Sequence, residues 1–372
     1  MEIVGLIALV TAFVITLFSV MLIKRLAKVL HFVDEPGERK VHQTPIPLGG
    51  GVAIFIGVFF TIFLAVLSVS LIKIYQPSWL PKVIYDYLPG VSSMIPRLTI
   101  IFVGGMLIFL VGLIDDIWGL KPRWKLLGQL IVAVYLVLFG IRLSIFVSYG
   151  PYFSYIITIL WIILITNSLN LLDHMDGLSA GVTAVLSLIF GIAAFQTGQY
   201  FIASFLAAIL GATLGFLVFN TNPASIFMGD AGSLLLGYLI SVLTIIFTFY
   251  RAQGGYILYV LFVPLLVVAV PVFDTIMVII IRLKNRKPIF KGDMNHLAHR
   301  LVGLGMSVRS AVFTIYLLTL GTGLPAILLY IIDKNSSLLG GLLVLFQVTL
   351  VLLIITILEQ AGRSKNQSNG KP

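Results

Sequence analysis

The chain has 372 residues, of which 59% are hydrophobic and only 10% charged, and its mean hydropathy is +1.11. This composition excludes an ordinary soluble domain and a disordered chain, and it is typical of a protein embedded in a membrane. The sequence contains no cysteine, which excludes disulfides, thiol catalysis and cysteine-ligated zinc. The formal net charge of +10 comes without a basic helix or groove with interleaved aromatics, so we expect no nucleic-acid partner.

About eleven apolar stretches are each long enough to cross a bilayer as a helix. They lie at residues 3–23, 49–72, 98–114, 126–141, 155–172, 178–196, 200–219, 233–249, 256–281, 309–331 and 338–358. We therefore expect an all-α integral membrane protein with about eleven transmembrane helices. Residues 1–361 would form a single polytopic membrane domain, and the polar segment 362–372 would be a disordered cytoplasmic tail.

The distribution of basic residues predicts the orientation. An odd number of spans places the termini on opposite sides of the membrane. With the N-terminus outside, eighteen of the 24 Lys and Arg face the cytoplasm. The outer side then holds only Lys73, Lys82, Arg97, Arg142, Arg251 and Lys334. Because cytoplasmic loops carry an excess of Lys and Arg, we expect the N-terminus outside and the C-terminus in the cytoplasm.

Ten of the fourteen acidic residues fall in the loops of this predicted cytoplasmic face. Asp115 and Asp116 end the third stretch, Asp173 and Asp176 follow the fifth, and Asp230 precedes the eighth. A carboxylate near hydrocarbon costs several kcal/mol unless it is paired, hydrated or bound to metal. Grouped carboxylates with few cationic partners suggest a hard divalent cation and phosphate chemistry.

Simpler interpretations remain for each acidic segment. The Asp115-Asp116 pair is also compatible with a solvated helix end that has Lys121, Arg123 and Lys125 as counter-ions. Asn167, Asn170 and Asp173 recur every three residues, so they stay near one helix face. There they could hold a metal-bound diphosphate or a ribose, or they could be polar contacts between helices.

Three further segments are candidates for substrate contact. Lys40 and His42 precede the second stretch and suit either phosphate binding or a basic flank of the membrane. His296, His299 and Arg300 suit contact with sugar hydroxyls or phosphate, or a structural role. In the loop before Asp230, an aromatic residue could stack on a base or pack in the core; this residue is Phe227.

Asp274 lies inside the ninth apolar stretch and could be a helix-packing partner or a site residue. Acids near the middle of membrane spans are typical of cation-coupled transporters, which form the alternative from a different functional class. Most acids of this chain lie at the ends of the stretches instead, so the pattern favours an enzyme site at the membrane surface.

The blocks GLIDD, NSLNLLDHMDG, NPASIFMGDAGS and NHLAHRL resemble, in this order and spacing, the polyprenyl-phosphate N-acetylhexosamine-1-phosphate transferases. The resemblance runs from about Asp34 to Ser307. It implies a multi-pass enzyme of the inner (plasma) membrane with a cytoplasmic site that depends on magnesium, with manganese as the alternative ion. Such an enzyme transfers a sugar 1-phosphate from a UDP-sugar to a polyprenyl phosphate, here expected to be undecaprenyl phosphate, and releases UMP.

The resemblance also implies a role for each matching residue. Asp115, Asp116 and Asp173 match acids assigned to catalysis, and Asp230 matches the magnesium ligand. The matching substrate-binding positions are Asn170, Asp176, Asn220, Phe227, His296 and His299, to which we add Arg300, Lys40 and His42.

Two departures and the histidine motif refine the expectation. His174 stands where the family usually has glycine, and Ala298 where many members have another histidine, so Ala298→His should be tolerated. The NHLAHRL form resembles the branch that uses UDP-N-acetylglucosamine. The alternative branch, which transfers phospho-MurNAc-pentapeptide, typically carries three histidines followed by Phe-Glu. Single or double displacement, and a homodimer as a further partner, stay open.

Overall fold

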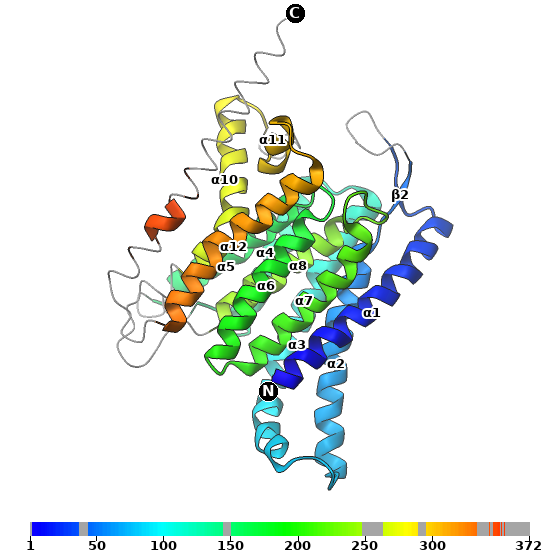
Figure 1. Ribbon diagram of the computed structural model, residues 1–372, viewed down its shortest axis with the longest axis vertical. Helices are drawn as coiled ribbons and strands as arrows, with labels where there is room; N and C mark the ends of the chain where they lie inside the picture. The colour runs from blue at the N-terminus through cyan, green and yellow to red at the C-terminus, as the bar shows by residue number, and fades with distance from the viewer. Residues whose placement is uncertain are drawn as a thin grey trace, which may run out of the picture.

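The computed structural model describes residues 2–36, 44–143, 150–247, 263–288 and 295–332, with positions 342, 345–349, 351 and 353. Within these ranges the regular structure is helical apart from one short hairpin (Figure 1). In that hairpin, β1 (Val33–Asp34) pairs antiparallel with β2 (Ile46–Pro47). The predicted all-α architecture is confirmed, while the predicted tail at 362–372 lies outside the described residues.

Eight helices of the described chain are long and apolar enough to cross a membrane. They are α1 (Glu2–Val29), α2 (Gly50–Tyr75), α3 (Lys82–Trp118), α5 (Pro151–Leu171), α6 (Leu178–Gln196), α7 (Tyr200–Asn220), α8 (Gly229–Ile246) and α12 (Val308–Ile332). The shorter helices are α4 (Pro122–Leu138), α10 (Ala269–Lys284) and α11 (Leu297–Gly303). Helix α3 begins well before the predicted residue 98. It includes Pro89 and Pro96, which do not end it.

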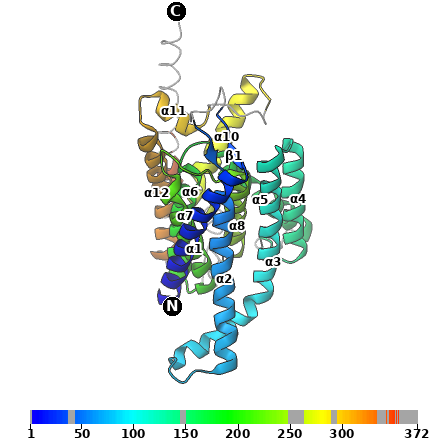
Figure 2. The ribbon, with the colours of Figure 1, turned by 90° about the vertical axis from the view of Figure 1, so that its right-hand side faces the viewer.

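Successive helices run up and down, so the acid-bearing connections gather at one end of the bundle (Figures 1 and 2). This end is the upper one in Figure 1 and carries β2 and α11, while the N-terminus lies towards the lower end. The connections between α3 and α4, α5 and α6, and α7 and α8 all lie at the upper end. Antiparallel packing of the helices therefore explains why these loops lie on one face, as the sequence predicted.

Helix α8 occupies the centre of the bundle. In its most apolar window 83% of the residues are buried, compared with 17% for α1, and it packs against α2, α3 and α5. The backbones of α3 and α8 approach closely, because a Cβ atom at Gly112 would lie 2.5 Å from the backbone of Ala231. The N-terminus of α8 is thereby held in the middle of the acid-bearing end.

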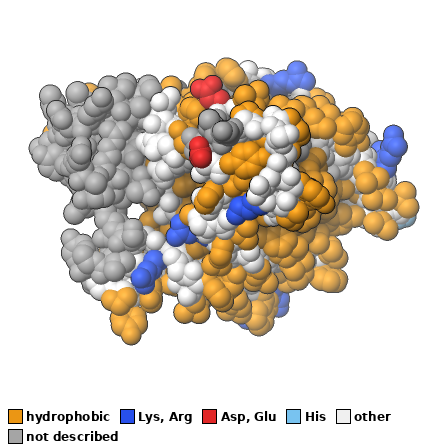
Figure 3. Space-filling view, turned by 90° about the horizontal axis from the view of Figure 1, so that it is seen from below, with side chains coloured by type: hydrophobic (Ala, Val, Ile, Leu, Met, Phe, Trp, Pro, Cys, Tyr) orange, Lys and Arg blue, Asp and Glu red, His pale blue; other side chains and the backbone are white. Residues whose placement is uncertain are grey.

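The outside of the bundle is hydrophobic, as a membrane protein requires. Leu22 on α1, Phe63 on α2 and Phe313 on α12 each expose more than half of their surface. Seen from below, hydrophobic side chains cover most of the described surface, with scattered Lys and Arg (Figure 3). Lipid contact explains why such side chains are left exposed, since water would disfavour them.

Candidate active site

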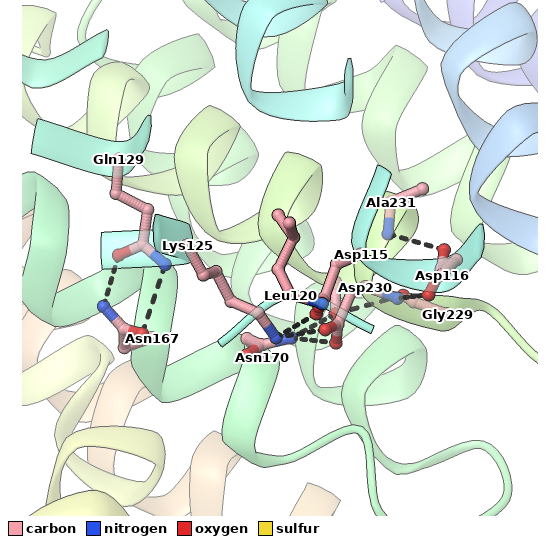
Figure 4. Close-up of polar contacts among 11 residues, drawn as sticks. Asp115, Asp116, Leu120, Lys125, Gln129, Asn167, Asn170, Gly229, Asp230 and Ala231 are labelled. Carbon is pink, nitrogen blue, oxygen red and sulfur yellow. Dashed lines mark hydrogen bonds and ion pairs between the residues drawn. The ribbon is translucent and has the colours of Figure 1, made fainter. Parts of the chain in front are cut away.

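The acids at the end of α3 meet the first turn of α8 (Figure 4). Asp116 accepts hydrogen bonds from the backbone N–H groups of Asp230 at 2.7 Å and Ala231 at 3.0 Å. The first N–H groups of a helix have no partner within the helix, so this carboxylate satisfies two of them. Gly229 permits the approach, because a Cβ atom there would lie 2.5 Å from the Asp116 carboxylate. Asp116 therefore anchors α8 to α3.

Lys125, in the first turn of α4, bridges two carboxylates of this site. Its Nζ lies 2.5 Å from Asp115 Oδ2 and also contacts Asp230 Oδ2. The second oxygen of Asp115 accepts the backbone N–H of Leu120 at 2.6 Å. The ammonium group offsets the repulsion between the two carboxylates, which would otherwise disfavour their ionised forms. From the sequence, Lys125 was considered only as a counter-ion of the aspartate pair. Its position shortly after that pair is the feature that could have indicated a place in the site.

Asn170 joins the same site from the end of α5. Its Nδ2 donates to Asp230 Oδ1 at 2.6 Å and to Ser233 Oγ at 2.8 Å. Asn167, one turn earlier, donates instead to Gln129 on α4 at 2.5 Å. The predicted alignment of the two amides thus brings Asn170 to the acids, while Asn167 links α5 to α4. We call Asp115, Asp116, Lys125, Asn170 and Asp230 the carboxylate cluster.

Asp173 lies in the connection between α5 and α6. Burial raises the pKa of the Asp173 carboxyl well above 3.8, and the charges of Asp230, Asp116 and Asp176 raise it further. A low-dielectric environment and nearby negative charges both favour the neutral acid. Asp173 is therefore electrostatically part of the same site and is suited to hold a proton.

Asp176 and Asn220 connect the loops around this site. Asp176 Oδ2 accepts from Asn222 Nδ2 and from the Ala224 N–H, both at 2.9 Å. Asn220 accepts the N–H of Gly177 at 3.0 Å and donates to the carbonyl of Ile226 at 2.9 Å. A pocket of about 660 Å³ opens beside them, lined by Asp176, Gly177, Thr221, Asn222, Arg309, Ser310, Val312, Phe313 and Tyr316.

Phe227 is half-buried and its backbone ties the loop before α8 to the start of α2. Its N–H donates to Pro47 and its carbonyl accepts from Gly50, each at 2.9 Å. Two other predicted substrate residues, Lys40 and His42, lie outside the described ranges.

A second group of polar residues surrounds Asp274 on α10. Asp274 accepts from His296 Nδ1 at 2.8 Å and from the N–H of Leu297 at 2.7 Å. The ring of His174 stacks on His296 with centroids 4.3 Å apart and lies 4.7 Å from His299. We call Asp274, His174, His296 and His299 the histidine cluster. Asp274 thus links α10 to the start of α11 and pairs with His296, a predicted substrate residue; its role as a packing partner or a site residue stays open.

The residues after His296 are mostly buried at the start of α11. Arg300 is 8% exposed and its Nε donates to the carbonyl of Asn295 at 2.6 Å. Ala298 is 1% exposed, so a histidine there would overpack the core, and the expected tolerance of Ala298→His is revised.

Comparison with known proteins places this sequence in a family. The model of the family described as glycosyl transferase family 4 matches residues 98–248, which hold the whole carboxylate cluster. A probable undecaprenyl-phosphate N-acetylglucosaminyl 1-phosphate transferase of Bacillus subtilis is 35% identical over 361 residues, covering 94% of this chain and 91% of that protein. A decaprenyl-phosphate N-acetylglucosaminephosphotransferase of Mycobacterium leprae is 34% identical over 331 residues, covering 82% and 79%.

Another branch matches over a shorter length. A phospho-N-acetylmuramoyl-pentapeptide-transferase of Bacillus cytotoxicus is 39% identical over 155 residues, which is 37% of this chain and 48% of that protein. The near full-length matches decide the assignment: the chain belongs to glycosyl transferase family 4, among the polyprenyl-phosphate N-acetylhexosamine-1-phosphate transferases.

Proposed function

We propose that the protein transfers N-acetylglucosamine 1-phosphate from UDP-N-acetylglucosamine to undecaprenyl phosphate, releases UMP and so begins a lipid-linked envelope glycan. One observation carries the proposal. Asp115, Asp230 and the Lys125 ammonium converge at one end of a membrane bundle, in a chain that matches, over 94% of its length, a relative named as an undecaprenyl-phosphate N-acetylglucosaminyl 1-phosphate transferase. Charged groups at a membrane edge suit a reaction between a lipid phosphate and a water-soluble diphosphate.

The oxygen donors of the carboxylate cluster fit magnesium, with manganese as the alternative. Magnesium is commonly held by one or two carboxylates together with substrate phosphates and water. Within the described residues no group of three or more acidic or histidine side chains is arranged to hold a metal ion. Asp230 would hold the ion with Asp115 as second donor. When bound, the ion offsets the negative charge of the diphosphate.

The protein's own groups then have distinct roles. Asp116 is engaged by the N-terminus of α8, so its role is to hold Asp230 in place. Burial raises the pKa of the Asp173 carboxyl, so this group is suited to exchange a proton with the lipid phosphate. The lipid phosphate would attack the sugar-linked phosphorus, and UMP would leave.

The test is a UMP-release assay with the purified full-length protein, magnesium and undecaprenyl phosphate. UDP-N-acetylglucosamine and UDP-MurNAc-pentapeptide are compared under identical conditions. We expect release of UMP with UDP-N-acetylglucosamine. Preference for the pentapeptide donor would move the protein to the other branch, and absence of UMP with both donors would refute the proposed function.

The orientation is also a proposal: eleven spans, with the carboxylate cluster facing the cytoplasm of a cell whose plasma membrane holds the protein. The Lys and Arg distribution supports it. Ser307 and Ser93 are exposed at opposite ends of the bundle, and the chain has no cysteine. A membrane-impermeant thiol reagent applied to intact cells should label Ser93→Cys only. Labelling of Ser307→Cys from outside would reverse the orientation.

A further inference from the structure

The histidine cluster contains a carboxylate that the proposed reaction does not use. The side chain of Asp274 is 2% exposed, and that of its partner His296 is 5% exposed. An ionised carboxylate only accepts hydrogen bonds, so Nδ1 of His296 must carry the proton of the 2.8 Å contact. In the neutral ring, Nε2 is then an acceptor. The described residues offer this Nε2 no hydrogen-bond partner.

His174 restrains the same imidazole of His296 by stacking against its face. Its ring is inclined by only 29° to that of His296 and by 34° to that of His299. The carbonyl of Leu171 can only accept, so the 2.8 Å contact to His174 Nδ1 is a donated bond. Burial and the neighbouring His296 lower the pKa of His174 to about 3, so its ring is neutral at physiological pH. A neutral ring stacks on histidine without charge repulsion.

The stack also joins the two parts of the site. His174 directly follows Asp173, whose pKa responds to Asp230 and Asp116 of the carboxylate cluster. His296 is therefore placed at the edge of the site where the sugar diphosphate would lie under the proposed function. An acceptor nitrogen with a fixed tautomer, a fixed plane and no partner among the described residues is a preorganised contact for a substrate donor group.

We propose that Asp274 is a positioning residue for the sugar donor: it fixes the tautomer of His296, and His174 fixes the ring plane, so that Nε2 accepts a hydrogen bond from a hydroxyl or amide N–H of the donor sugar. This inference rests on the proposed function and deepens it. Replacement by asparagine leaves one acceptor oxygen for two N–H donors, His296 Nδ1–H and the Leu297 backbone. The amide NH₂ would then favour the opposite tautomer of His296.

A double-mutant cycle tests whether Asp274 acts through His296. We expect Asp274→Asn and His296→Gln each to lower kcat/KM for UDP-N-acetylglucosamine by about 10- to 100-fold, the range seen when an orienting partner of a histidine is removed. The double variant should lose no more than the worse single one. The KM for undecaprenyl phosphate should stay unchanged. Thr275→Val is the matched control, since Thr275 is buried on the same helix and its hydroxyl has no described partner.

Other outcomes overturn the inference. Losses that add in the double variant would show that Asp274 acts independently of His296, and activity of Asp274→Asn within twofold of wild type would show that it positions nothing. If that variant does not accumulate in membranes, His174→Phe and His174→Ala replace it. The phenylalanine keeps a stacking ring and should keep most activity, whereas the alanine should lose about 10-fold; equal behaviour of the two would refute the role of the stack.

Failure of the proposed function gives a different result. A wild-type protein that releases no UMP refutes that function, and calorimetric binding of UDP-N-acetylglucosamine to wild type and Asp274→Asn then decides the inference alone. Equal affinity of the two proteins would overturn it, and weaker binding by the variant would support it.

Discussion

The carboxylate cluster and the histidine cluster adjoin at the connection between α5 and α6, yet they are built in opposite ways. The side chains of Lys125 and Asp230 keep 20% and 27% of their surface exposed, whereas Asp274 and His296 keep 2% and 5%. The first cluster is partly exposed to solvent, and under the proposed function a metal ion and substrate would replace the lysine contact. The second is closed, and its hydrogen bonds are set before any substrate arrives.

Two neighbouring residues show the same contrast in their titration. Burial raises the pKa of the Asp173 carboxyl and lowers the pKa of the His174 imidazole, because the charged form of either group is disfavoured away from water. Burial therefore disfavours the charged form of both side chains. The acid is suited to exchange a proton during the reaction, and the neutral imidazole of His174 serves as a flat ring for stacking.

The largest effect is expected in the open cluster. Asp230→Asn removes the proposed metal ligand but preserves shape, and it should lower kcat/KM by roughly 1,000-fold, as when a main electrostatic group of an active site is lost. The measurement is UMP release by purified variants with matched membrane levels. Asp86→Asn, an exposed acid near the opposite end of α3, is the control and should behave as wild type. Near-normal turnover of Asp230→Asn would remove Asp230 from the site.

The next effect tests the bridge between the carboxylates. Lys125→Gln leaves Asp115 and Asp230 without their shared cation, and loss of charged hydrogen bonds of about 3 kcal/mol corresponds to roughly 150-fold in kcat/KM. Lys121→Gln, on the connection just before α4, is the matched control. If both variants were equally active, Lys125 would be only a surface counter-ion.

These two predictions differ in how far the sequence supported them. Asp230 was predicted from a local pattern, because the acids sit at the ends of apolar stretches and antiparallel packing brings those ends together. The role of Lys125 depends on a contact between residues 105 positions apart in the chain. The pairing of Asp274 with His296 likewise depends on how α10 packs against α11. Periodicity locates helices and their ends, but such side-chain partners are set by tertiary packing.

The fold shows the same limit. Most predicted stretches correspond to helices, because about 20 apolar residues have few alternatives in a bilayer. The start of α3 was predicted too late, since proline normally interrupts a helix and Pro89 and Pro96 do not do so here. Helices α4 and α10 have 17 and 16 residues, so their length alone does not establish a span.

Arg300 tests the edge of the histidine cluster. Its guanidinium is a planar set of donors suited to diphosphate or sugar oxygens. Arg300→Ala should reduce kcat/KM for the sugar nucleotide by roughly 10- to 150-fold. Arg300→Lys should restore little of this, because lysine lacks the planar fork. Arg286→Ala, at an exposed position after α10, is the control. Full activity of Arg300→Ala would leave Arg300 a purely structural role.

Substitution of Asp173 tests whether the pKa of this carboxyl is raised in the folded protein. The folded protein binds the Asp173 proton more tightly than the unfolded chain, so the stability it contributes is lost as the pH rises from 3.8 through the raised pKa. Asp173→Asn cannot ionise, so we expect a higher Tm than wild type at pH 8 and a similar Tm at pH 4, together with lost activity. A Tm difference that did not grow with pH would contradict the raised pKa.

Substitution of His174 is expected to have the smallest effect on stability at neutral pH. The pH dependence of stability has the opposite sign to that expected for Asp173. The unfolded chain takes up a proton on this residue below about 6.5, while the folded protein resists protonation until about pH 3. Wild-type stability should therefore fall as the pH drops through this interval, because protons favour the unfolded state. His174→Phe keeps the ring but cannot be protonated, so its Tm should match wild type near pH 7.5 and fall less steeply towards pH 5. The comparison is made in detergent with Thr275→Val as the control. Parallel Tm curves for wild type and His174→Phe would show that the His174 imidazole is open to water and to protons, and the closed character of the histidine cluster would then be wrong.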